Sequence, residues 1–594
     1  MYIYDRTFLG GQSEVFEPHL LGEFRLNRLP AKVQQRFSKV GASWRDALAE
    51  AIGSGIKNPN VLADIIFFMQ YPGRMTAGVG KLIDRRESDF VKLRAEWILY
   101  RTIANGLLKP ATAKPICDVF LPAIRSGNYE NYVAGQTTGL ITLMINGRSS
   151  GVSQTEAFDS MQKTVESLGP NDSIYLANWQ FTPTDVHLTV RRPDMKTWGD
   201  LLKNKARNGV RIRIIISVLP PLGSTFQTDL TLIDKIIGEL PLAERDNLKY
   251  IASPHPANLI ASHHQKIMVV KKGGTTIGYC GGLDISFNRT PDKTPGGWGG
   301  WGPNFVWHDI HAKLEGLIAR DLEKEFVLRW NREKDKSTGS KLSGWKGFEK
   351  LAQTPVISAD REISKNIHKL QMLRTVTVGT NPQDIRRDDI WQGYFRLIGC
   401  ATRFIFMENQ YFHEPRMADA IVKQAQAQPD LIVIIVATSK SDDPVNIYTE
   451  HCLALRHEFF ARLFAGIPKS RLRVYTKFTA MVHSKLIMVD DRALSMGSAN
   501  ANPRGFFLDT ELNVMLDDAE AVTKFRRRLW SHDLGVAEPS VATWSVSDFI
   551  AKWDAVANAN QGKAPDKMTG EGLIPFGPRD VNGGKSRVIQ DLWC

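Results

Sequence analysis

The apolar and polar positions of this 594-residue chain follow one order twice after about residue 155. In the first copy, a stretch of helical periodicity precedes apolar runs, at 157–168, 173–181, 210–218 and 248–251. In the second copy, a similar stretch precedes similar runs, at 389–401, 403–412, 431–437 and 472–475. A series that recurs in the same order indicates a duplicated structural unit.

The apolar runs are continuous, and segments of helical pattern separate them. Strands of this kind are buried on both faces, so the pattern predicts an α/β fold with two similar lobes. We expect the lobes at 131–355 and 356–540. Residues 1–130 do not repeat and are predicted to form a helical N-terminal extension, and 541–594 a C-terminal helix and tail.

Composition narrows the range of partners. With 43% hydrophobic and 23% charged residues the chain is globular, and its net charge of +13 favours an anionic partner such as nucleic acid, a phospholipid surface or a phosphate ester. The longest apolar runs fall short of the ~20 residues that span a bilayer. The first residues include Asp5 and Glu14 and contain no apolar stretch of the kind found in signal peptides. We therefore expect synthesis in the cytoplasm without a signal peptide.

Each copy closes on a His-x-Lys pair at the start of a predicted strand, His264 with Lys266 and His483 with Lys485. Residues two positions apart on a strand project from the same face, so each pair can contact one ligand. A single pair would carry little weight, because many histidines are structural. Two pairs with similar following segments predict a shared site.

These motifs resemble the phospholipase D superfamily, whose signature is a duplicated HxKxxxxD. The segment 483–490 matches the whole signature, and the His-His-Gln-Lys of 263–266 is similar to eukaryotic-type phospholipases D. The segments 307–316 and 407–412 also resemble parts of those enzymes. The resemblance implies that mixed sheets flanked by helices form one pseudo-symmetric core.

The resemblance also implies hydrolysis of a phosphodiester through a phosphohistidine, with His264 as nucleophile and His483 as acid. The residues themselves leave that direction open. In such a reaction one imidazole attacks phosphorus while the other protonates the leaving alcohol, and their roles reverse when water is activated. Lys266 and Lys485 would supply positive charge at the phosphate. Further candidate substrate contacts are Asn288, Asn500, Ser498, Gly282 and Asn409. No cofactor or metal ion is expected.

Each imidazole also needs a carboxylate that holds its tautomer. The resemblance assigns Asp309 to one histidine, whereas Asp509 and Glu511 compete for the other. A plain alignment of the repeats pairs Asp309 with Asp509.

The first copy has Lys271 where the signature has Asp. Lys271 lies an odd number of positions beyond His264, so on a strand it faces away from the catalytic side. We expect it to end a hairpin without changing the chemistry, the alternative being an inactive first lobe.

The predicted function is therefore a phospholipase D that hydrolyses glycerophospholipids to phosphatidic acid at a membrane surface. A nuclease or other phosphodiesterase of the superfamily and a non-catalytic lipid-binding protein are the alternatives; nucleic acid is the less favoured partner. The layout also resembles bacterial type VI secretion phospholipase effectors. That resemblance implies secretion into target cells, with secretion machinery and a cognate immunity protein as partners.

Overall fold

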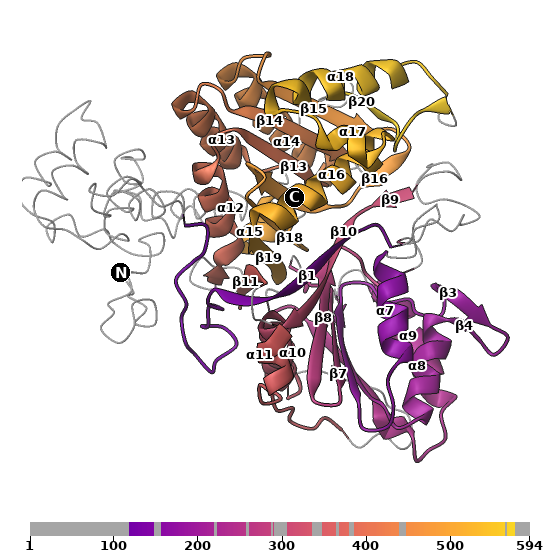
Figure 1. Ribbon diagram of the computed structural model, residues 1–594. Coiled ribbons are helices and arrows are strands. Elements are labelled where there is room, and N and C mark those ends of the chain that lie inside the picture. The colour runs from indigo at the N-terminus through magenta and orange to yellow at the C-terminus, as the bar shows by residue number, and fades with distance from the viewer. Residues whose placement is uncertain are drawn as a thin grey trace, which may run out of the picture.

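The computed structural model describes residues 118–147, 156–218, 223–256, 261–286, 289, 306–335, 347–363, 367–378, 385–438, 447–564 and 567–576. One sheet of 16 strands extends through this part of the chain, with helices against both of its faces (Figure 1). The predicted α/β class is confirmed. Among the described helices, none combines the length and the apolar character needed to cross a bilayer.

The strands before residue 320 form one half of the sheet. From the centre outward they are β1 (Thr137–Ile145), β10 (Ile310–Gly316), β8 (Thr275–Gly281), β7 (Ile267–Lys272), β2 (Ser173–Asn178), β5 (Arg211–Val218) and β6 (Leu248–Pro254). The β2–β5 and β5–β6 pairs are parallel, and the other pairs of this half are antiparallel.

The later strands form the other half in a corresponding order. From the centre outward they are β11 (His368–Thr377), β19 (Glu511–Asp517), β18 (Ala493–Gly497), β17 (Lys485–Val489), β13 (Phe404–Asn409), β14 (Ile432–Thr438), β15 (Leu472–Lys477) and β20 (Leu573–Pro575). β12 (Ile385–Asp388) pairs with β11. The central β1 and β11 pair antiparallel, with Thr138 opposite Lys369, and join the two halves into one sheet.

Helices cover both faces of each half. The first half carries α7 (Ala157–Glu166), α8 (Trp198–Arg207), α9 (Gly223–Gly238), α10 (Leu317–Glu333) and α11 (Ser358–Ile363). The second half carries α12 (Asp389–Cys400), α13 (Pro415–Ala427), α14 (Ile447–Gly466), α15 (Pro503–Phe507), α16 (Ala519–Leu534), α17 (Glu538–Ala542) and α18 (Phe549–Asn560). One buried apolar cluster continues from α10 to α16 and α18 across the junction, so the halves share a core.

Short elements complete the fold. They are the β3–β4 hairpin (His187–Arg192, Met195–Thr197), the parallel pair β9 and β16 (Val306–His308, Ala480–Val482), and the 3-10 turns at Arg245–Asn247 and Val546–Asp548.

The ends of the chain are described only in part. Residues 1–117, most of the predicted N-terminal extension, lie outside the described residues, and no helix forms in the described part, 118–130, where Ile124 makes an isolated bridge to Val133. The predicted C-terminal helix is present as α18, and β20, which follows it, pairs with β15 at the edge of the sheet.

Candidate active site

The two His-x-Lys segments approach each other across the junction. Each histidine uses its backbone N–H to bind a carbonyl of the opposite half: His264 donates to Thr510 (2.9 Å), and His483 donates to His308 (2.7 Å). Both rings are buried, and each is 8% exposed or less. The sheet pairing therefore brings together two motifs that are more than 200 positions apart.

Each imidazole contacts a carboxylate of the other half. Glu511 Oε1 lies 2.9 Å from His264 Nδ1, and Asp309 Oδ2 lies 2.6 Å from His483 Nδ1. A carboxylate at Nδ1 orients the ring and directs Nε2 towards a substrate.

Asp509, the other candidate, binds elsewhere. Its carboxylate accepts a bond from Arg504 Nη2 (2.9 Å) and another from the Ser262 backbone N–H (2.7 Å). The strand register explains why a plain alignment of the repeats pairs Asp309 with Asp509 instead of with Glu511, the residue that contacts His264. Gly281 lies opposite His311 and Gly497 lies opposite Asn513, so the counterpart of Asp309 is Glu511.

Both lysines lie beside their histidines. Lys266 Nζ donates to the His264 carbonyl (2.7 Å) and lies 3.6 Å from Asp284 Oδ2. Lys485 Nζ donates to the His483 carbonyl and to Gln410 Oε1. Burial and neighbouring cations, Lys266 among them, lower the pKa of Lys485 to about 7, although Asp309 opposes this shift.

Burial, followed by the charges of the lysines, holds the pKa values of His264 and His483 well below their usual range. Both rings are therefore neutral at pH 7 when no anion occupies the site. Burial raises the pKa of Asp309 to about 6 and that of Glu511 well above its usual range, with Asp509 adding to the second shift.

The small residues Gly282 and Ser498, which follow the two motifs, lie against the carboxylates of Asp309 and Glu511. A Cβ atom on Gly282 would lie 2.1 Å from Asp309 Oδ1, so only glycine leaves room for that side chain. Ser498, its counterpart, donates from Oγ to Glu511 Oε2 at 2.5 Å. Both residues therefore lie against the carboxylates that contact the two histidines, and their contact with substrate stays a prediction.

Two of the three predicted asparagines belong to the described residues, and they lie in different settings. Asn500 is 9% exposed, and its buried Oδ1 has no hydrogen-bond partner among the described residues. Asn409 is fully buried, and its Oδ1 accepts the backbone N–H groups of Tyr411 and Ala501. Asn288 lies outside the described residues.

Three further residues join the site. The ring of Trp179 packs edge-on against His264 at 5.7 Å, and that of Trp307 against His483 at 4.8 Å. The Arg289 guanidinium stacks on Trp307 at 3.7 Å. The apolar pattern of the predicted strand could have located Trp179, which directly follows β2. No sequence spacing connects Arg289 with the two histidines, so sequence analysis had no signal for it.

Comparison with known proteins agrees with this geometry. A family model described as "Phospholipase D" matches residues 296–441, and one described as "Cardiolipin synthase, PLD-like domain" matches residues 394–532. The chain belongs to the phospholipase D superfamily.

Its similarity to individual superfamily members is low. The chain is 26% identical over 452 residues to phospholipase D A of Dictyostelium discoideum, covering 61% of this chain and 34% of that protein. It is 25% identical over 341 residues to a cardiolipin synthase of Clostridium perfringens, covering 56% of this chain and 61% of that protein. A solved phosphatidylserine synthase of Haemophilus influenzae aligns over 71% of this chain and 95% of that chain, with 13% identity and a TM-score of 0.45.

The last position of the superfamily signature is structural in both halves. Asp490 accepts the backbone N–H groups of residues 402–404, where β13 begins; the Thr402 N–H donates at 2.7 Å. Its first-half counterpart Lys271 pairs with Glu323 at 3.2 Å, near a β7–β8 turn in which Gly273 and Gly274 have φ of 54° and 88°. The expected hairpin end is therefore present.

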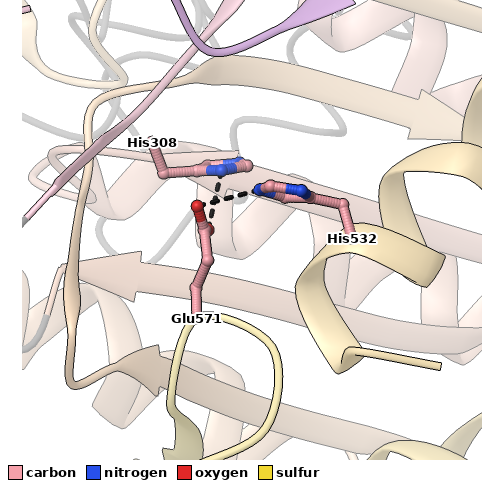
Figure 2. A group of neighbouring side chains, drawn as sticks. All are labelled: His308, His532 and Glu571. Carbon is pink, nitrogen blue, oxygen red and sulfur yellow. Dashed lines mark hydrogen bonds and ion pairs between the residues drawn. The ribbon is translucent and has the colours of Figure 1, made fainter. Parts of the chain in front are cut away.

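Sequence spacing also missed a buried charged cluster next to the superfamily motifs. His308, His532 and Glu571 each offer a ligand atom within 4.8 Å of the others, a spacing that a metal ion could use (Figure 2). Lys477 Nζ, however, lies 2.8 Å from Glu571 Oε2 and 2.6 Å from Asp533 Oδ1. Since this ammonium already pairs with both carboxylates and would repel a metal cation, the cluster fits an ion-pair network better than a metal site.

Proposed function

We propose that this chain is a phospholipase D-type phosphodiesterase that hydrolyses glycerophospholipids to phosphatidic acid and a free headgroup. His264 attacks phosphorus to form a phosphohistidine, and His483 protonates the leaving alcohol and then activates water. Asp309 and Glu511 orient the two rings. The assignment of attack to His264 follows the resemblance to the eukaryotic-type enzymes.

One observation carries the proposal: the two His–carboxylate pairs cross the junction, so that each half completes the site of the other. Two oriented imidazoles are the minimum that in-line attack and leaving-group protonation require. Lys266 and Lys485 lie beside them to offset the charge of a phosphate. A bound phosphate anion would also raise the lowered histidine pKa values, so that the acid gains its proton when substrate is present.

Two lobes are part of this proposal. Residues 131–355 and 356–540 would be copies of one unit that form a pseudo-symmetric core. The matching strand orders and pairing directions outward from β1 and β11 support this.

Transfer of the phosphatidyl group to an alcohol is a second candidate reaction. A phosphohistidine can react with an alcohol instead of water, and several similar proteins are cardiolipin synthases.

The test incubates mixed phospholipid vesicles, with and without added glycerol, and separately plasmid DNA, with the full chain. The variants are His264→Ala and His483→Ala, and His187→Ala on the exposed β3 strand is the matched control. We expect phosphatidic acid and free headgroup from wild type and control, and a loss of at least about 1,000-fold in both site variants. DNA cleavage without headgroup release would replace the lipid substrate by nucleic acid.

The proposal extends to a role as a secreted antibacterial effector, which the resemblance in layout supports. Expression directed to the periplasm of a susceptible bacterium should arrest growth, and His483→Ala should abolish the arrest. Equal growth with both forms would count against this role.

A further inference from the structure

The imidazole of His308 lies between two buried carboxylates. Its Nε2 is 2.9 Å from Glu408 Oε2, and its Nδ1 is 2.8 Å from Glu571 Oε2. Glu408 belongs to β13. Glu571, drawn beside His308 in Figure 2, belongs to the turn before β20, near the C-terminal end of the described chain. His308 and Glu408 are fully buried, and Glu571 is nearly so.

Other charged groups surround this ring. Lys477 of β15 lies 3.4 Å from Glu408, Asp533 of α16 lies 3.9 Å from His308 Nε2, and His532 of α16 lies 2.9 Å from Glu571. Although burial favours a neutral ring and Lys477 repels a charged one, Glu571 and Glu408 raise the pKa of His308 to about 10. The ring is therefore a cation at neutral pH, held by two anions.

The backbone of His308 is the support of the second catalytic histidine. Its carbonyl accepts the N–H groups of His483 (2.7 Å) and Ser484 (3.1 Å). The next residue, Asp309, holds the His483 ring, and Ser484 Oγ donates to Glu408 at 3.1 Å. A shift of the His308 ring would therefore move both the backbone and the carboxylate that orient His483.

The residue that supports the His264 backbone differs from His308. Thr510 occupies the position of His308, since its carbonyl accepts the His264 N–H, and its Oγ1 lies 3.0 Å from His263 Nδ1. The carbonyls that accept the N–H groups of the two catalytic histidines thus belong to different residue types, a neutral threonine at His264 and a charged histidine at His483.

We propose that His308 is a positioning residue for His483, and that Glu571 fixes it from the C-terminal segment. The proposal rests on the proposed function, because it assigns His483 a step in phosphodiester cleavage. It makes the turn before β20 part of the machinery that aligns the active site.

The test compares Glu571→Gln with Glu571→Asp and with the matched control Glu323→Gln. Glu323 is also buried, and it is bound by two cations, Arg320 and Lys271, at the β7–β8 hairpin end instead of beside the His-x-Lys pairs. We expect Glu571→Gln to lower kcat by about 10- to 100-fold with KM within twofold, as loss of a group that orients a catalytic residue does. The alkaline limb of its kcat profile should move to lower pH, because His308 loses its proton earlier without Glu571. Glu571→Asp should keep the limb near its wild-type position.

Glu323→Gln should lower Tm to a similar extent and leave kcat and the pH profile unchanged. If Glu571→Gln behaves like this control, His308 has only a structural role and the proposal is wrong. A readout without turnover separates this failure from failure of the proposed function. The downfield proton NMR signal of the His483–Asp309 hydrogen bond should shift or broaden in Glu571→Gln, whether or not any lipid is a substrate; an unchanged signal would also overturn the proposal.

Discussion

Glu511 Oε1 lies 2.9 Å from His264 Nδ1, although 247 positions and the junction between the halves separate the two residues. Asp309 and His483 form the reciprocal contact. Each histidine of the two His-x-Lys pairs therefore depends on a carboxylate of the other half. A truncation to either half should lose activity even if it folds.

Glu511→Gln and Asp509→Asn should separate orientation from stability. Glu511→Gln removes the carboxylate at His264, and we expect kcat to fall about 100-fold or more, because the ring loses its preferred tautomer. Asp509→Asn leaves that contact intact but weakens the partner of buried Arg504, so we expect a lower Tm with kcat within about fivefold of wild type. Steady-state kinetics and thermal unfolding of both variants measure the difference. The reverse ranking of kcat would assign the orienting role to Asp509.

Gly282→Ala should be far more harmful than Ser498→Ala. The added methyl group would lie 2.1 Å from Asp309 Oδ1, so Asp309 must move away from His483. Ser498→Ala adds no atom against the carboxylate; it removes the 2.5 Å bond to Glu511 and the contacts of Oγ with the Leu512 backbone. We expect loss of at least about 100-fold in kcat for Gly282→Ala and about 10-fold for Ser498→Ala. Assays of headgroup release check this order, and circular dichroism establishes that both variants are folded.

Restoring the signature with Lys271→Asp should not raise activity. Lys271 pairs with Glu323 at the hairpin end, so the change removes that contact and places two carboxylates together. We expect kcat within twofold of wild type and a free energy of unfolding lower by about 1 kcal/mol. A several-fold gain in kcat would instead mean that the first lobe is impaired by its lysine.

His308 should make stability depend on alkaline pH. Its pKa is raised to about 10 in the folded protein, against an ordinary value of 6.5. A raised pKa stabilises the protonated folded state, so the contribution is complete below about pH 6.5 and is lost as the pH rises through about 10. The difference in unfolding free energy between wild type and His308→Asn should therefore shrink from pH 6.5 to 10. Urea titrations over this range measure it, and a constant difference would mean a neutral ring.

Local patterns carried much of the prediction. The continuous apolar runs predicted β5 and β14 within one or two residues, because a buried strand needs apolar side chains on both faces. The odd offset of Lys271 from His264 likewise predicted that its side chain faces away from the catalytic side, since side chains alternate along a strand. In the structure Lys271 contacts Glu323 of α10. The two His-x-Lys pairs were visible for the same reason.

Only the folded chain decided which acid meets which histidine. Asp509 and Glu511 are two positions apart, and the pairing of β19 with β18 selects Glu511 as the counterpart of Asp309. The contact of His308 with Glu571 joins a strand to a turn, and no regular spacing in the sequence connects these two residues. Periodicity reports which face of an element is buried, whereas strand register and the closure of distant segments determine which side chains meet there.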